Sequence, residues 1–293
     1  MATIRNPIEW SVESFKLWSR AVVSGSHAVH HTGEHLNDLV PAIRPITIAD
    51  LKDVLRKGVE DFAAYRTDVI FLCLIYPVVG VVLARAAYGR DMMQLLFPLA
   101  SGFALVGPFA AIGLYEMSRR REEGARITWK DAFGVLNSPS FAAILTLGLV
   151  LMVIFVLWLI AAQAIYSVTL GPEPPASFGT LINDALTTGA GWMLIVAGVG
   201  VGFLFAVLVL SISVVSFPLL LDRKVGVDTA IWTSVRAVIA NPVPMAAWGA
   251  IVTAGLVIGS IPLFVGLAIV MPVLGHATWH LYRKLVPPMA GSG

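Results

Sequence analysis

Long, nearly uncharged apolar runs are the feature that most restricts the folds open to this chain. Five of them are separated by short polar blocks: Val69–Tyr88, Leu95–Met117, Phe141–Val168, Ala190–Leu221 and Met245–Tyr282. A bilayer-spanning helix needs about 20 mostly apolar residues, so each run is long enough for at least one span. With 57% hydrophobic and 13% charged residues, the composition is typical of a multi-pass membrane protein.

The fifth run is too long for one straight span. Gly259–Phe264 ("GSIPLF") places a glycine and a proline at its middle, so we divide the run into a helical hairpin of two spans. The sequence therefore predicts an all-α, polytopic membrane helical bundle with six transmembrane helices. Five transmembrane helices is the alternative count.

Lysine and arginine lie almost entirely in alternate loops. They occur before the first span, after the second, fourth and sixth spans, and not in Thr169–Gly189 or at the turn around Pro262. Only Arg85 and Arg90 depart from this pattern. The positive-inside rule therefore predicts that both termini lie in the cytoplasm. The net charge of +2 gives no indication of nucleic acid as a partner.

Three cytoplasmic segments share one plan and indicate an internal repeat. Thr47–Asp68, Thr128–Ser140 and Asp228–Pro244 are each followed by a pair of spans. We interpret the bundle as three hairpins, each preceded by an amphipathic interfacial helix. The alternative is that polar helices simply fill the loops between spans.

The first of these lead segments has a helix-start signal and one apolar face. Thr47 and Asp50 have the spacing of a capping box. At helical spacing, one face holds Ile48, Leu51, Leu55, Val59 and Phe62. Trp129 and Trp232, in the other two lead segments, suit the membrane interface because indole has an apolar body and a polar tip.

Residues 1–45 form an N-terminal arm ahead of a membrane domain at 46–286 and a C-terminal tail at 287–293. The arm begins with a predicted interfacial or docking helix that carries Trp10 and Trp18. These two side chains are candidate contacts to lipid headgroups or to a partner protein.

A histidine-rich stretch, "SHAVHHTGEHLND", follows that helix and contains four of the six histidines. His27, His31 and His35 are four residues apart, a spacing at which imidazoles on one helical turn share a divalent cation. We treat them as a candidate metal site. A solvated face that changes charge near neutral pH and a docking face for a partner are the alternatives.

Acidic and basic residues meet where the spans end in basic loops. Candidate contacts to lipid headgroups or a partner are Glu116, Arg119, Arg120, Arg121, Asp222 and Arg223. Topology determination alone also explains the arginines. His276 and His280 lie at the end of the last span, and we expect hydrogen-bonded interfacial residues there, with haem or quinone contact as the alternative.

Several signals of catalysis or ion coupling are missing. The predicted spans contain almost no ionisable side chain at mid-membrane depth, and the sequence shows no phosphate loop and no identifiable Ser-His-Asp set. The single cysteine, Cys73, excludes a disulfide within this chain. Prolines inside the spans are compatible with a transport site but are also common in passive bundles.

Three stretches carry a resemblance to a known family. Gly107–Phe133, Phe217–Met245 and Met271–Val286 resemble an uncharacterised bacterial family of integral membrane proteins, known as a domain of unknown function, over about Ile46 to Val286. The lead-helix-plus-hairpin plan is more distantly similar to the membrane domain of some glycerophosphodiester phosphodiesterases, without their catalytic domain. The resemblance implies a location in the bacterial inner membrane and no established activity.

Members of that family are sometimes labelled as cytochrome c oxidase subunit I, and this sequence tests the label. A haem-copper catalytic subunit needs several histidines inside its spans, whereas only His276 and His280 approach one. The label leaves open a role beside such a complex.

We therefore expect a non-enzymatic accessory or assembly subunit of a larger respiratory or photosynthetic membrane complex. Its partners would be membrane lipids and that complex, and no cofactor is expected. A small-solute or lipid transporter, and a haem- or metal-binding membrane protein, are the alternatives.

Overall fold

The computed structural model describes residues 41–73, 85, 92–125, 131–132, 134–135, 138–262 and 265–287. All regular secondary structure within these ranges is helical, which confirms the all-α prediction. Residues 1–40 of the predicted N-terminal arm, which include Trp10, Trp18 and the histidine-rich stretch, lie outside the described residues.

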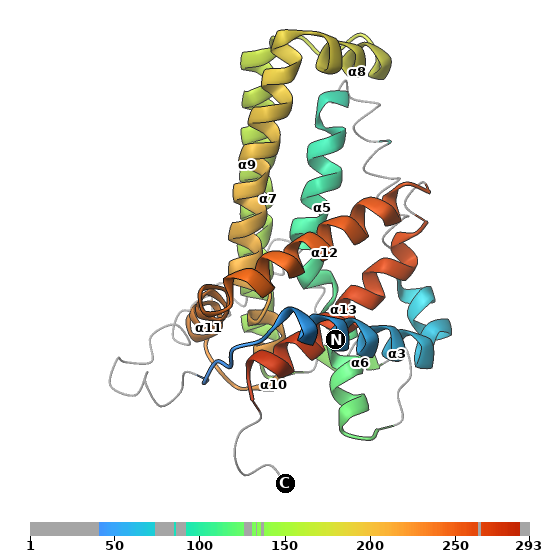
Figure 1. Cartoon of the computed structure of the whole chain (residues 1–293), viewed down its shortest axis with the longest axis vertical. Coiled ribbons are helices and arrows are strands. Elements are labelled where there is room, and N and C mark those ends of the chain that lie inside the picture. Colours follow the sequence, from blue (N-terminus) through green and yellow to red (C-terminus); the bar gives the residue numbers. More distant parts are fainter. Residues whose placement is uncertain are drawn as a thin grey trace, which may run out of the picture.

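A tall hairpin of two apolar helices stands at one side of the molecule (Figure 1). It consists of α7 (Phe141–Thr169) and α9 (Gly189–Ser213), joined by the short α8 (Phe178–Thr187). The 29 residues of α7 extend about 43 Å, more than the roughly 30 Å of a bilayer's hydrocarbon core. After α9 the chain continues through α10 (Ser216–Asp222), and Gly189–Asp222 is one candidate span.

The predicted second span is two helices rather than one. α5 (Leu96–Ala110), preceded by the 3-10 turn η1 (Met93–Leu95), packs on α7, and α6 (Ile112–Glu122) continues below it. The break falls at Ala111, three residues after Pro108. Proline has no backbone N–H for the helical ladder and its ring crowds the preceding turn, so a bend close to it is expected.

The remaining helices form a base across the lower end of the hairpin (Figure 1). They are α3 (Ile48–Cys73), α11 (Val227–Ala240), α12 (Pro242–Ser260) and α13 (Leu267–Leu285). α3 and α13 run closely along each other, because Gly58 of α3 lets the backbone of Ala277 approach; a Cβ at Gly58 would lie 2.7 Å from the Ala277 Cβ. α13 also packs against α6 and α12, so it forms the centre of the base.

The predicted count of six spans is not confirmed. Within the described residues, three helices are long and apolar enough to cross a membrane: Phe141–Thr169, Gly189–Asp222 and Pro242–Ser260. These correspond to the predicted third, fourth and fifth spans. The second is divided as above, the sixth corresponds to the largely buried and partly polar α13, and most of the first lies outside the described residues.

The two lead segments that the structure describes well are helical. Thr47 and Asp50 form the predicted capping box, with the Thr47 N–H donating to Asp50 Oδ2 at 2.9 Å and the Asp50 N–H to Thr47 Oγ1 at 3.4 Å. The predicted face of α3 is wrong in part, because Ile48 and Val59 are 53% and 50% exposed. The buried face is shifted by the contact with α13 and runs through Leu51, Val54, Gly58 and Asp61.

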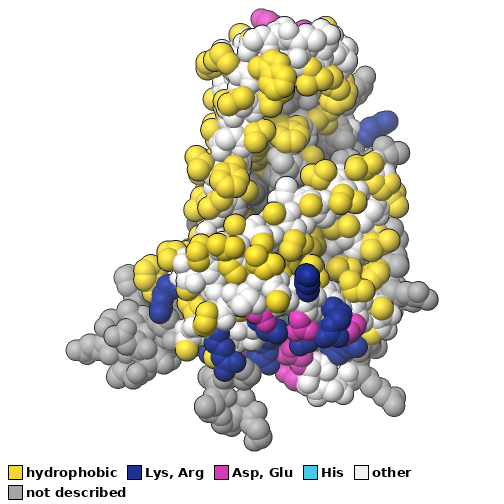
Figure 2. All heavy atoms as spheres, viewed as in Figure 1, with side chains coloured by type: hydrophobic (Ala, Val, Ile, Leu, Met, Phe, Trp, Pro, Cys, Tyr) yellow, Lys and Arg dark blue, Asp and Glu magenta, His cyan; other side chains and the backbone are white. Residues whose placement is uncertain are grey.

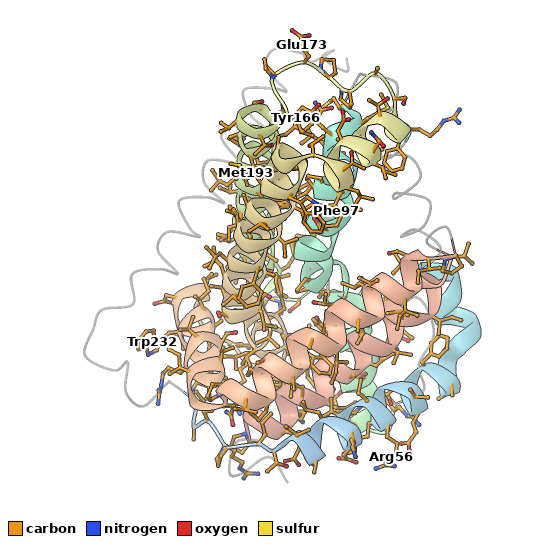
Figure 3. The ribbon with its side chains drawn as sticks, turned by 45° about the horizontal axis from the view of Figure 1, so that its top comes forward. Arg56, Phe97, Tyr166, Glu173, Met193 and Trp232 are labelled. Carbon is orange, nitrogen blue, oxygen red and sulfur yellow. The ribbon has the colours of Figure 1, made fainter. Side chains whose placement is uncertain are left out.

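The third lead segment is α11, and the Asn241-Pro242 break separates it from α12. Its Trp232 points outward at the base, as expected for an interfacial side chain (Figure 3). Of the second lead segment, residues 128–130, 133, 136 and 137 lie outside the described residues, so its predicted helix is not tested.

Charged side chains gather at the base, and apolar side chains cover the hairpin above it (Figure 2). The far end carries Glu173 and the cation-free loop between α7 and α9, which holds the amphipathic α8 (Figure 3). That the base faces the cytoplasm, as the positive-inside rule indicates, stays a prediction.

Candidate functional site

α6 contributes residues to both groups of polar side chains at the base. Its residues from Leu114 to Ser118 are buried, and its last turn carries Arg119, Arg120 and Arg121. Cations at the last turn interact favourably with the carbonyl end of the helix dipole. Two polar assemblies lie on opposite sides of this helix.

The first assembly is a buried cluster built from three helices. Asp61 of α3 accepts hydrogen bonds at Oδ2 from Ser118 Oγ of α6 at 2.6 Å and from His280 Nε2 of α13 at 2.9 Å. Ser118 Oγ also lies 2.8 Å from His276 Nδ1. Asp61 is only 4% exposed and His276 is fully buried, so these groups are removed from water.

Arg121 provides the positive charge that balances the buried carboxylate of Asp61. Its guanidinium pairs with Oδ1 of Asp61. Burial alone raises the pKa of Asp61, but the hydrogen bonds from His280 and Ser118 outweigh it and hold the pKa below its ordinary value. A buried carboxylate with such partners ties the helices together, since breaking a pair of this kind costs about 3–5 kcal/mol.

A second row of charges closes the base nearer to solvent. Arg283 Nε lies 2.9 Å from Glu122 Oε2, and Lys284 Nζ lies 3.1 Å from both Asp50 and Asp53. The pKa of Asp53 falls to about 2, mainly through its hydrogen bond from Arg56. These pairs connect α13 with α6 and α3, although exposed pairs contribute little each.

The second assembly lies on the other side of α6 and is centred on Glu116. Its carboxylate accepts two hydrogen bonds from Arg119, both at 2.8 Å, and one from Arg120 at 2.6 Å. Arg120 also reaches Asp131 at 2.5 Å. Glu116 is buried, so it fixes both guanidinium groups at the edge of the base.

A hollow of about 260 Å³ lies beside these arginines. Its walls come from α6, from the residues just before α7 and from the end of α10. They include Glu116, Arg119, Arg120, Asp222, Arg223 and Lys224. Four cations thus face two carboxylates at a point where one candidate span begins and another ends.

The structure brings together most of the predicted contact residues but separates one. Glu116, Arg119, Arg120, Asp222 and Arg223 share the hollow. Arg121 points to the other side of α6, where it pairs with Asp61. Glu116 pairs with Arg119 at 2.8 Å, and Asp222 pairs with Arg223 at 3.6 Å and with Arg283 at 3.4 Å.

The two histidines of α13 are buried, and the expectation that both are hydrogen-bonded is confirmed only in part. His280 is hydrogen-bonded as expected, but Nε2 of His276 has no partner among the described residues. The sequence analysis missed Asp61 and Ser118. Asp61 could have been recognised from its spacing. It lies seven residues after Val54, which places an acidic side chain on the buried face of a lead helix.

The described ranges contain no group of three or more His, Cys, Asp or Glu side chains placed to hold a metal ion. The candidate metal ligands His27, His31 and His35 lie outside these ranges and stay a prediction. A further hollow, of about 320 Å³, lies between α7 and α9 and is lined mainly by apolar side chains such as Ile165 and Met193.

Comparison of the chain with curated proteins and with solved structures found no match. A family model does match, over less of the chain than the resemblance noted above, and it includes the motif Gly107–Phe133 but ends early in the motif that starts at Phe217. The similarity to glycerophosphodiester phosphodiesterases and the oxidase label stay predictions. Residues 96–222, from the start of α5 to the end of α10, match the model described as "Predicted integral membrane protein (DUF2189)", so this part of the chain is similar to that family.

Proposed function

We propose that the protein is a non-enzymatic accessory or assembly subunit of a larger complex in the bacterial inner membrane. In this proposal the base and both termini face the cytoplasm, and α9 presents its exposed apolar face to a partner. The family match supports an integral membrane protein and goes no further.

The observation that carries the proposal is that very little of α9 is buried within the protein. In the most apolar 18-residue stretch of its span, only 6% of the residues are buried. Large side chains such as Val196, Phe203 and Leu204 are more than 60% exposed. Apolar burial gives little drive for helix association in lipid, so a spanning helix is held mainly by close packing with other helices. A helix with so little of its span buried is suited to obtain that packing from a partner protein.

The geometry of the buried cluster supports a non-enzymatic role. Asp61, Ser118 and His276 have the residue types of a nucleophilic triad, but Ser118 Oγ donates its hydrogen to Asp61, so that hydrogen is not available to the imidazole of His276. A triad needs the hydroxyl to donate to the imidazole and to face a substrate. Ser118 is instead buried, and neither hollow described above includes it.

The test is purification of the tagged full-length protein in a mild detergent, followed by mass spectrometry of the proteins that remain bound. We expect a defined set of membrane proteins, lost when Phe203 and Leu204 on α9 are both replaced by alanine. The matched control replaces Leu149 and Val153, which are exposed on α7. A monodisperse protein that runs alone would contradict the proposal, as would equal loss in both variants.

A transport role is the second candidate, and the buried ionisable cluster favours it. Buried acids and histidines between helices occur in proton relays. Proteoliposomes loaded with a pH-sensitive dye would test this role. A proton flux that disappears in Asp61→Asn would favour transport, and equal traces for protein-containing and empty liposomes would remove the candidate.

A further inference from the structure

The hollow beside Glu116 has the position and the chemistry of an anion site. Two candidate spans meet it, because Ser140 immediately precedes α7 and Asp222 ends the span that begins at Gly189. A point where spans start and end lies at the level of the lipid headgroups. Four cationic side chains line the hollow there against two carboxylates.

The two arginines of α6 are held in place before any ligand binds. Glu116 fixes Arg119 through two hydrogen bonds and Arg120 through one. A guanidinium has five N–H groups, and within the described part of the chain three of those of Arg119 are engaged. The others are available in a planar arrangement that suits phosphate oxygens.

The start of α7 adds donors of a second kind. Ser138, Pro139 and Ser140 line the hollow, and the side chain of Ser140, the N-cap residue, makes no capping hydrogen bond to the first turn. The first N–H groups of a helix have no partner within the helix and carry its positive dipole end. An anion in the hollow would therefore face both guanidinium groups and a helix N-terminus.

Of the four cations that line the hollow, Lys224 has the fewest interactions with other described residues. It is exposed, and no ion pair joins it to a described residue, whereas Arg223 lies against Asp222 and donates to the carbonyl oxygen of Pro287. Its ammonium group is thus free to turn toward an incoming anion, and its removal leaves the pairs around Glu116 and Asp222 intact.

From these observations we infer that the hollow binds a phosphoryl anion, coordinated by Arg119, Arg120, Arg223 and Lys224 and by the N-terminus of α7. Two sources offer this group at the membrane surface: the phosphodiester of an acidic phospholipid and free inorganic phosphate. The position of the hollow between the ends of two spans suits the lipid. The same cationic side chains would bind the phosphoryl oxygens of either source.

The experiment uses the delipidated full-length protein in detergent, with binding of phosphatidylglycerol measured by native mass spectrometry. Phosphatidylcholine serves as the lipid control. Lys224→Gln should weaken phosphatidylglycerol binding about fivefold, the effect of one cation at a membrane surface. Lys224→Arg should retain it. The matched control is Lys52→Gln, which removes an exposed lysine of α3 that no ion pair joins to a described residue, and which should change binding less than twofold.

A second arm adds inorganic phosphate to the same samples. If phosphate displaces phosphatidylglycerol from the wild type, the site takes the free anion as well; if it does not, the site is specific for the lipid. Both results support the inference when the Lys224 variants behave as stated. Equal weakening by Lys224→Gln and Lys52→Gln would overturn it, because only general surface charge would then be at work. Equal binding of both lipids would also overturn it.

Discussion

Replacing Gly58 with alanine should force α3 away from α13. An added Cβ would lie 2.7 Å from the carbonyl oxygen of Val273 and 2.7 Å and 2.9 Å from the Cβ and N of Ala277. Two of these three atoms belong to the backbone, so no rotamer change relieves the clash and the helices must separate. Overpacking of this kind costs about 1–3 kcal/mol.

The matched control is Gly198→Ala in α9, where an added Cβ meets no atom within 4 Å. Alanine is favoured over glycine inside a helix by about 0.8–1 kcal/mol, and this gain is common to both variants. The difference between them therefore isolates the steric cost. Gly275→Ala should fall between the two, because its closest contact, at 2.6 Å, is the flexible side chain of Leu114.

The assay is thermal unfolding in detergent, followed by the fluorescence of the eight tryptophans and by size-exclusion chromatography of heated samples. One kcal/mol shifts the melting temperature of a soluble domain of 150–250 residues by about 2–4 °C. Gly58→Ala should accordingly melt roughly 2–12 °C below Gly198→Ala. A Gly58→Ala protein that melts at or above the control would refute the close approach of α3 and α13.

Three further predictions test other contacts. Asn241→Ala should lower the free energy of unfolding by about 1–3 kcal/mol, because the buried backbone N–H of Ile46 loses the Asn241 Oδ1 that accepts its hydrogen bond at 2.8 Å. Chemical denaturation in micelles measures this free energy, and unchanged stability would contradict the prediction. Asp61→Asn should cost about 3–5 kcal/mol at pH 7. Since the pKa of Asp61 is lowered by folding, its contribution is complete above the ordinary value of 3.8 and is lost as the pH falls through the folded value. Melting curves of the wild type and this variant should therefore converge as the pH falls below 3.8, and parallel curves would argue against the assignment. With Cys73 replaced by serine, a cysteine at Glu173 should react with a membrane-impermeant maleimide in intact spheroplasts, and one at Lys224 only after lysis; the reverse result would overturn the orientation.

Much of the architecture follows from local sequence patterns. The apolar runs that became α7 and α9 are long, uncharged and bounded by polar residues, so their length and type are determined without tertiary contacts. The capping box at Thr47 is likewise local, because its two partners lie three residues apart. The break at Asn241-Pro242 follows from the chemistry of proline.

The features that were missed depend on contacts between distant segments. The face of α3 is determined by α13, so periodicity alone placed Ile48 and Val59 on the wrong side. The buried cluster joins Asp61 to a histidine 219 residues away, and no local signal reports such a pair. The same holds for Arg121, whose neighbours Arg119 and Arg120 face the opposite side of α6.

The pairing of α3 with α13 has a consequence for biosynthesis. A ribosome releases Asp61 long before His280, which lies 219 residues later, at about 5–20 residues per second. During roughly 10–40 seconds of synthesis, the future contact face of α3 stays uncovered. The base is completed only when the last helix arrives, so a chain truncated before α13 would expose Leu51 and Val54, two side chains that the finished protein keeps almost fully buried. That exposed face offers cellular quality control a simple means of distinguishing an unfinished chain from a complete one.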